Sequence, residues 1–125
     1  MEMGHGDEIV LADGNFPAAS HAQQLIRCDG HTIPALLEAI LAFFPIDTYV
    51  EHPIQLMAVV PGDPVEPTIW KDYEQIVQRH TECSGPFELI ERFAFYERTK
   101  KAFVVVATSE KAQYANIILK KGVIK

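Results

Sequence analysis

Phe103-Val104-Val105-Val106-Ala107 is the stretch that decides the fold, because it is apolar, uninterrupted and rich in β-branched residues. Such a run is typical of a strand that is buried on both faces of a sheet. Shorter apolar runs predict further strands at residues 8–12, 24–28, 55–60, 87–91 and 117–119. Helices are predicted at residues 32–44, 67–80 and 93–102. Because strands and helices alternate, we expect a single α/β domain over residues 1–125, with a mainly parallel or mixed sheet and flanking helices.

Local signals set the predicted helix boundaries. Thr32 can cap the first long helix, Pro34 falls in its first turn, and Pro45 ends it. Pro61-Gly62-Asp63-Pro64 predicts a turn after the strand at residues 55–60. Residues 93–102 carry charges that favour a helix and aromatics that favour a strand, and we assign them to a helix.

Composition excludes several classes of protein. The chain has 125 residues, with 11 Lys and Arg against 17 Asp and Glu, so its net charge is −6. An acidic chain without a basic patch is not expected to bind nucleic acid or an anionic membrane surface. No apolar run is long enough to span a bilayer. Cys28 and Cys83 match no disulfide framework, and no signal peptide is visible, so we expect reduced thiols in a cytoplasmic protein.

Polar residues flank the first predicted strand. Asp13 lies just beyond its carboxyl end, where ligands collect in α/β sheets. His5 lies before it in a Gly4-His5-Gly6 turn, whose glycines let a ligand approach the backbone. A histidine and a carboxylate can act together as general acid and base near neutral pH. The alternative is that His5 only caps a turn and Asp13 only holds a loop.

A second group of polar residues flanks the later strands. Arg92 follows one strand, and Tyr114 and Asn116 precede another. Their donors and acceptors suit a polyhydroxylated ligand, although an ion pair, a core-edge phenol and an Asx-turn would also explain them. The sequence contains no phosphate-binding loop. No spacing of possible metal ligands resembles a metal site, and this includes the spacing of His21, Asp29 and His31. We therefore expect neither a nucleotide cofactor nor a metal.

Three longer motifs resemble the RbsD/FucU family of sugar mutarotases. The first is the Gly4-His5-Gly6-Asp7 segment, continuing to Asn15-Phe16-Pro17-Ala18. The second is Arg92-Phe93-Ala94-Phe95-Tyr96-Glu97-Arg98. The third runs from Tyr114 and Asn116 through Ile117-Ile118-Leu119-Lys120-Lys121-Gly122-Val123. The second and third motifs match the fucose branch of the family.

The resemblance implies an α/β enzyme without a cofactor that interconverts the α and β anomers of a monosaccharide, with L-fucose as the expected substrate. It implies a homo-oligomer, a decamer of two stacked pentamers. It makes His5 the proton donor and makes Asp13, Arg92, Tyr114 and Asn116 sugar-binding residues. Phe95 or Trp70 is a further candidate for covering the apolar face of the sugar.

Two alternatives stay open beside this function. One is a ribose-type mutarotase that also exchanges pyranose and furanose forms, and the other is a non-catalytic sugar-binding or assembly protein. The chain departs from the family pattern at two places. The helical segment that usually precedes the Gly-His-Gly-Asp motif is expected to be missing or nearly so. Ala115 replaces a usual glycine, which would shift the backbone if φ there were positive.

Overall fold

The computed structural model describes residues 2–81 and 87–124, which form one mixed sheet with helices on both faces. The strands are β1 (Glu8–Ala12), β2 (Leu25–Cys28), β3 (Ile54–Met57), β4 (Glu88–Ile90), β5 (Val104–Thr108) and β6 (Ile117–Lys120). The helices are α1 (Ala18–His21), α2 (Ile33–Leu41), α3 (Ile69–His80) and α4 (Arg92–Lys101). The predicted α/β class is confirmed.

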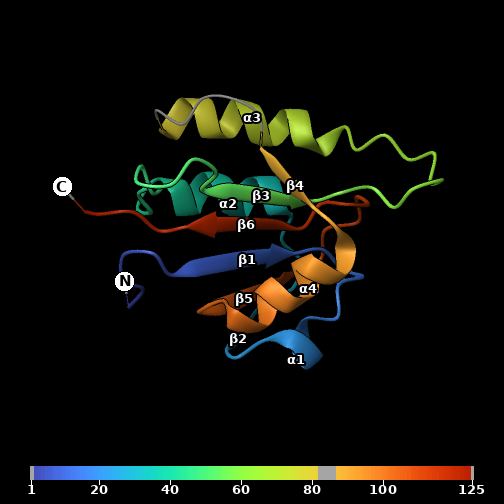
Figure 1. Ribbon diagram of the computed structural model, residues 1–125, viewed down its shortest axis with the longest axis horizontal. Coiled ribbons are helices and arrows are strands. Elements are labelled where there is room, and N and C mark those ends of the chain that lie inside the picture. The colour runs from blue at the N-terminus through green and yellow to red at the C-terminus, as the bar shows by residue number, and fades with distance from the viewer. Residues whose placement is uncertain (1, 82–86, 125) are drawn as a thin grey trace.

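The strand order is β2-β5-β1-β6-β3-β4 (Figure 1). β5 runs parallel to β1 and β2, and β3 runs parallel to β4. β6 lies between β1 and β3 and runs antiparallel to both. The carboxyl ends of β1 and β3 therefore meet the start of β6 at one end of the sheet.

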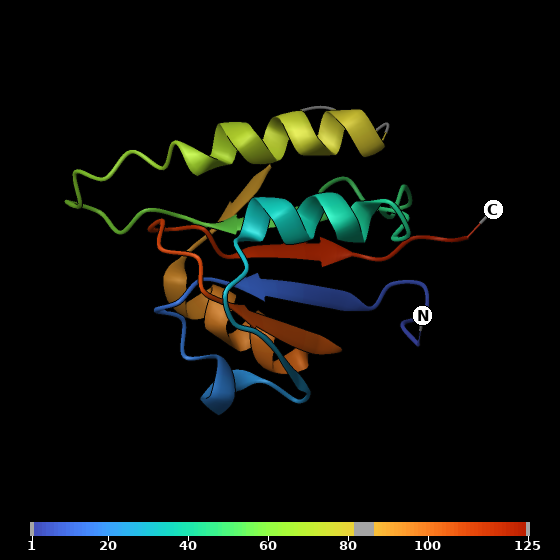
Figure 2. The ribbon, with the colours of Figure 1, turned by 180° about the vertical axis from the view of Figure 1, so that it is seen from behind.

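The central strands β1, β3, β5 and β6 are covered on both faces, which explains why they are largely buried and apolar without alternation. Ile9 and Leu11 of β1 point to the face that α2 and α3 cover. Val10 and Ala12 point to the opposite face, where α1 and α4 pack. Figures 1 and 2 show these two helical layers from opposite sides.

The predicted elements are found with small changes at their ends. The third strand ends at Met57 rather than residue 60, because the chain turns away toward the Pro61–Pro64 loop. Residues 92–101 are helical, and Glu91 caps this helix by accepting a hydrogen bond from the Ala94 N–H at 3.0 Å. The short helix α1 was not predicted, since four residues are too few to show a periodicity.

Cys28 has a free thiol and is partly buried against the core. Cys83 lies outside the described residues. No helix in the described part of the chain is long and apolar enough to cross a bilayer.

Candidate functional site

A polar cavity of about 210 Å³ opens at the end of the sheet where β1 and β3 finish and β6 begins. This is the end at which ligands are expected in an α/β sheet. The cavity is lined by Asp13, Asn15, Phe16, Met57, Asp63, Tyr96, Gln113, Tyr114 and Asn116. Three of the five predicted site residues, Asp13, Tyr114 and Asn116, therefore come together here.

Asp13 and Asn116 are joined directly at the floor of the cavity. The Asp13 backbone N–H donates to Asn116 Oδ1 at 2.7 Å, across 103 residues of sequence. The Asn116 oxygen is thus engaged, which leaves its amide N–H groups as the donors that it can offer to a ligand. The Asp13 side chain in turn accepts a hydrogen bond from the Asn15 N–H at 3.0 Å.

Asp13 is buried, with only 7% of the residue exposed. Burial raises the pKa of Asp13, and the nearby charge of Glu110 adds to that rise. Hydrogen bonds from backbone N–H groups, that of Asn15 foremost, lower the pKa but do not outweigh burial. Asp13 is therefore a better proton acceptor than a carboxylate in water.

Tyr114 presents its phenol at the rim of the same cavity. Its hydroxyl donates to Asp63 Oδ2 at 2.6 Å and accepts a hydrogen bond from the Val60 N–H at 3.3 Å. The hydrogen bond to Asp63 raises the pKa of Tyr114. Sequence reasoning missed Asp63, although the Pro61–Pro64 loop follows β3 at the carboxyl end of the sheet, where a ligand is expected.

Helix α3 holds the backbone that carries Tyr114 and Asn116. Trp70 Nε1 donates to the Tyr114 carbonyl at 2.8 Å, and the Tyr73 hydroxyl donates to the Ala115 carbonyl at 2.6 Å. Tyr114 has a φ of +57°, a left-handed conformation that is uncommon outside glycine. The positive φ falls on Tyr114 and not on Ala115, so the alanine does not force the backbone to shift.

Two aromatic rings, Phe16 and Tyr96, line the cavity. They meet edge to face, with ring centroids 5.4 Å apart. Phe95 is fully buried in the core below them, and Trp70 donates its N–H to the backbone of the loop. The aromatic surface that the cavity offers to a ligand is therefore supplied by Phe16 and Tyr96, and not by the two aromatics considered from the sequence.

Arg92 lies beside this cavity and not in it. It begins α4, and its guanidinium lies 4.4 Å from the centroid of the Phe93 ring. Arg92 lines a neighbouring cavity of about 270 Å³, which shares the Val60 loop with the Tyr114 hydroxyl. The positive charge of Arg92 lowers the pKa of Tyr114 and so opposes the raising effect of the hydrogen bond to Asp63.

His5 belongs to the segment before β1, and Figure 1 shows that this N-terminal segment lies at the end of the sheet opposite the carboxyl end of β1. Its turn is fixed by hydrogen bonds from the Asp7 N–H to the Gly4 carbonyl at 3.1 Å and from the Gly6 N–H to the Lys121 carbonyl at 2.8 Å. His5 Nε2 lies 3.2 Å from Asp47 Oδ1. The Asp47 contact was not predicted, since nothing in the sequence relates two residues 42 positions apart.

His5 and Asp13 do not share a site within one chain. The five residues of β1 separate them, and at about 3.3 Å per residue this places them more than about 15 Å apart. The expected pairing of His5 with Asp13 is therefore absent from a single copy.

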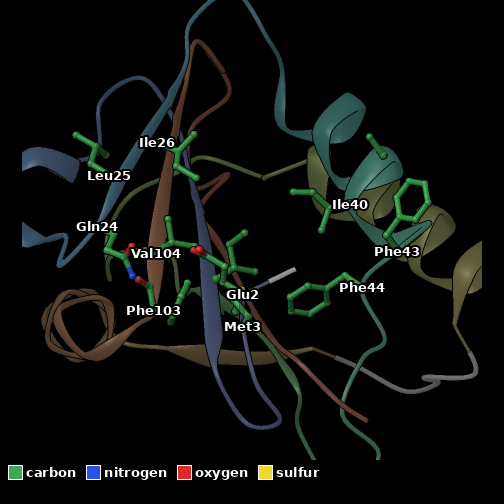
Figure 3. Close-up of a pocket in the computed structure, with 12 residues that line it drawn as sticks. Glu2, Met3, Gln24, Leu25, Ile26, Ile40, Phe43, Phe44, Phe103 and Val104 are labelled. Carbon is green, nitrogen blue, oxygen red and sulfur yellow. Dashed lines mark hydrogen bonds between the residues drawn. The ribbon is translucent and has the colours of Figure 1, made fainter. Parts of the chain in front are cut away.

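A third cavity, of about 500 Å³, is lined almost entirely by apolar side chains. Figure 3 shows it between Leu25, Ile26 and Val104 of the sheet and Ile40, Phe43 and Phe44 in and after α2. With few polar groups, it does not fit a polyhydroxylated ligand. Within residues 2–81 and 87–124, no three His, Cys, Asp or Glu side chains gather as a metal site would require.

The chain is similar to known proteins over nearly its whole length. A family model described as the RbsD / FucU transport protein family matches residues 1–124. Human fucose mutarotase is 55% identical over 128 residues, which cover 98% of this chain and 82% of the human protein. The structure of the fucose mutarotase from Streptococcus pneumoniae in complex with L-fucose is 54% identical, with a TM-score of 0.92 over 99% of this chain and 88% of that one. FucU from Bifidobacterium longum is 50% identical, with a TM-score of 0.96 over 99% of this chain and 89% of that one.

The mixed sheet and its polar end cavity define an α/β protein with a candidate site for a small polar ligand. The chain belongs to the RbsD/FucU family.

Proposed function

We propose that this chain interconverts the α and β anomers of L-fucose. The observation that carries the proposal is the polar cavity in which Asp13, Tyr114 and Asn116 meet. The similarity to fucose mutarotases, one of them solved with L-fucose, supports the choice of sugar. The reaction opens a cyclic hemiacetal and recloses it on the other face, so it requires only proton transfer and an oriented ring.

The cavity residues suit these requirements in different ways. Asp13 accepts a hydrogen bond from a sugar hydroxyl, and its raised pKa lets it take that proton. Asn116 and Tyr114 bind further hydroxyls, while Arg92 donates from the edge. Phe16 and Tyr96 cover the apolar C–H face of the ring.

His5 is the proposed proton donor, and its position requires a second copy of the chain. Because His5 and Asp13 lie at opposite ends of β1, both can reach one sugar only if each comes from a different copy. We therefore propose a homo-oligomer with sites between adjacent copies, the decamer of two stacked pentamers that the family resemblance implies. We also propose a cytoplasmic location, because the two cysteines of the sequence match no disulfide framework.

Magnetisation-transfer NMR on L-fucose tests the activity directly. The protein should accelerate exchange between the α and β anomeric protons, and should do so less well for D-ribose. An intact oligomer that leaves the exchange at its uncatalysed rate would favour a non-catalytic sugar-binding protein.

The variant His5→Asn tests proton transfer at His5. Asparagine keeps a neutral hydrogen bond but cannot accept a proton near pH 7. We expect the exchange rate to fall by about 10²–10⁴-fold, as for other positioned acids and bases. An oligomeric variant that exchanges anomers at the wild-type rate would remove His5 from the mechanism.

Mixed oligomers test the shared site. His5→Ala and Asp13→Asn chains should each be nearly inactive alone. Unfolding and refolding the two together should restore activity, because some sites then combine a wild-type His5 with a wild-type Asp13. If mixed oligomers form and stay as inactive as the separate variants, both residues do not act in one site between copies.

A further inference from the structure

We propose that Asp63 fixes the direction of the Tyr114 hydrogen bonds: the phenol gives its proton to Asp63 and accepts a proton from a sugar hydroxyl. This inference rests on the proposed function, since it requires L-fucose in the polar cavity that both residues line. The contact between Asp63 and Tyr114 is independent of that function, because the Tyr114 hydroxyl lies 2.6 Å from Asp63 Oδ2.

The loop after β3 holds the Asp63 carboxylate in place. Asp63 Oδ1 accepts the Val65 N–H at 3.0 Å, and the Asp63 backbone N–H donates to the Val60 carbonyl at 3.0 Å. The two carboxylate oxygens therefore have different partners, the loop for Oδ1 and the phenol for Oδ2. An ionised carboxylate accepts hydrogen bonds and has no proton to donate. The phenol must then be the donor in the contact between Tyr114 and Asp63.

The Tyr114 hydroxyl can make one further hydrogen bond. A hydroxyl carries one proton and two lone pairs. The Tyr114 proton goes to Asp63, and the Val60 N–H donates to one lone pair at 3.3 Å. The hydrogen bond to Asp63 raises the pKa of Tyr114, so the phenol keeps its proton at neutral pH. The lone pair that is left can only accept, so a sugar hydroxyl that meets Tyr114 has to donate to it.

Asn116 has the opposite direction in the same cavity. Its Oδ1 accepts the Asp13 N–H at 2.7 Å, which leaves only its amide N–H groups for a ligand. The cavity therefore holds one side chain that donates to the sugar and another that accepts from it. A sugar hydroxyl can bind to both, whereas a fluorine atom on the sugar has no proton to donate. Fluorinated sugars can therefore distinguish the two directions.

Binding of L-fucose analogues to the full chain, measured by calorimetry, identifies the hydroxyl that meets Tyr114. The analogues carry hydrogen or fluorine in place of the hydroxyl at C2, C3 or C4 in turn. Loss of the hydroxyl that meets Tyr114 should weaken binding to wild type but not to Tyr114→Phe, because the two changes remove the same contact. If no hydroxyl shows this coupling, Tyr114 does not accept from the sugar and the inference fails.

At the coupled position, the deoxy and fluorine analogues should bind wild type equally weakly. We expect both to bind about 5–10-fold less tightly than L-fucose, the usual effect of losing one hydrogen bond. A fluorine analogue that binds more tightly than its deoxy partner would show that Tyr114 donates to the sugar, and would overturn the inference.

The variant Asp63→Asn should reverse the direction. Only the oxygen of an amide can accept the Val65 N–H, so the new NH₂ group takes the place of Asp63 Oδ2 and donates to Tyr114. The phenol proton is then free for the sugar. In this variant the fluorine analogue should bind about 2–3-fold more tightly than the deoxy analogue. Equal binding of the two analogues, as in wild type, would refute the role of Asp63.

Glu66→Gln is the matched control. Glu66 is an exposed carboxylate in the same loop, so this change removes the same charge and leaves the contact between Asp63 and Tyr114. The variant should bind the deoxy and fluorine analogues equally, as wild type does. A preference for the fluorine analogue here as well would assign the effect to the charge of the loop and would overturn the role of Asp63.

Carbon-13 NMR of the Tyr114 ring during a pH titration requires no sugar. Because the hydrogen bond to Asp63 raises the pKa of Tyr114, Asp63→Asn should lower that pKa, and Glu66→Gln should leave it close to wild type. An unchanged pKa in Asp63→Asn would overturn the inference. A wild-type protein that binds none of the sugars would instead refute the proposed function, and the titration would still decide whether Tyr114 donates to Asp63.

Discussion

Tyr73→Phe removes one oxygen atom from beneath the candidate site. Tyr73 is fully buried in α3, and its hydroxyl donates to the Ala115 carbonyl at 2.6 Å. Ala115 is also fully buried, so water cannot easily replace the lost donor. The change therefore leaves a buried carbonyl without this partner, in the segment that carries Tyr114 and Asn116.

The structure sets the size of the expected effect. Leaving a buried acceptor unsatisfied costs about 1–3 kcal/mol of the free energy of unfolding. In a domain of this size, each kcal/mol lowers Tm by about 4 °C. Tyr114 holds a left-handed φ of +57°, a strained conformation that persists only while its surroundings enforce it. Loosening this segment should therefore raise KM for L-fucose more than it lowers kcat.

Urea unfolding and anomer exchange, measured on the same samples, test both expectations. Tyr49→Phe is the control, since Tyr49 is 69% exposed and the substitution keeps its ring against His5. It should leave the urea midpoint unchanged. If Tyr73→Phe unfolds at the same urea concentration as wild type, the hydrogen bond to Ala115 does not support the site.

Three further changes test the site residues and the cofactor requirement. Burial raises the pKa of Asp13 above its ordinary 3.8, so protonation of this carboxyl stabilises the folded state below that pH. This contribution to the free energy of unfolding is lost as pH rises through the folded-state pKa of Asp13. Asp13→Asn should therefore gain stability relative to wild type as pH rises from about 3.5 to 7 in urea titrations, and a gain that shrinks would contradict the assignment. Arg92→Ala should raise KM more than it lowers kcat, because a guanidinium does not shuttle protons near pH 7; a large loss in kcat at unchanged KM would count against this role. Anomer exchange should survive EDTA, and a loss that a divalent ion restores would show that a metal takes part.

Most of the fold could be predicted because its signals are local. The run at residues 103–107 is apolar at every position, and the structure buries that strand between two helical layers. The turn predicted at Pro61–Pro64 is found, and the helix that was expected to run up to Pro45 ends at Leu41. The pairing of β6 with β1 and β3 could not be predicted in the same way, because strand order depends on contacts between distant segments.

Only part of the candidate site could be predicted from the sequence. Asp13 could be placed at the carboxyl end of a strand, and that placement is confirmed. The same strand already implied that His5, on its other side, lies at the opposite end of the sheet. Asp47 could not be assigned, because nothing in the sequence relates it to His5, 42 residues away. The place of Asp63 after β3 was a usable signal, but its hydrogen bond with Tyr114, 51 residues away, was not predictable.

The opposite placement of His5 and Asp13 has a consequence for populations of mixed chains. If each copy supplies one half of two different sites, a copy carrying both His5→Ala and Asp13→Asn disables a site on each of its sides. Activity in randomly mixed oligomers should then fall as the square of the wild-type fraction, and not in proportion to it. A cell that makes both kinds of chain would lose more activity than its share of defective copies, so such an allele would act as partially dominant.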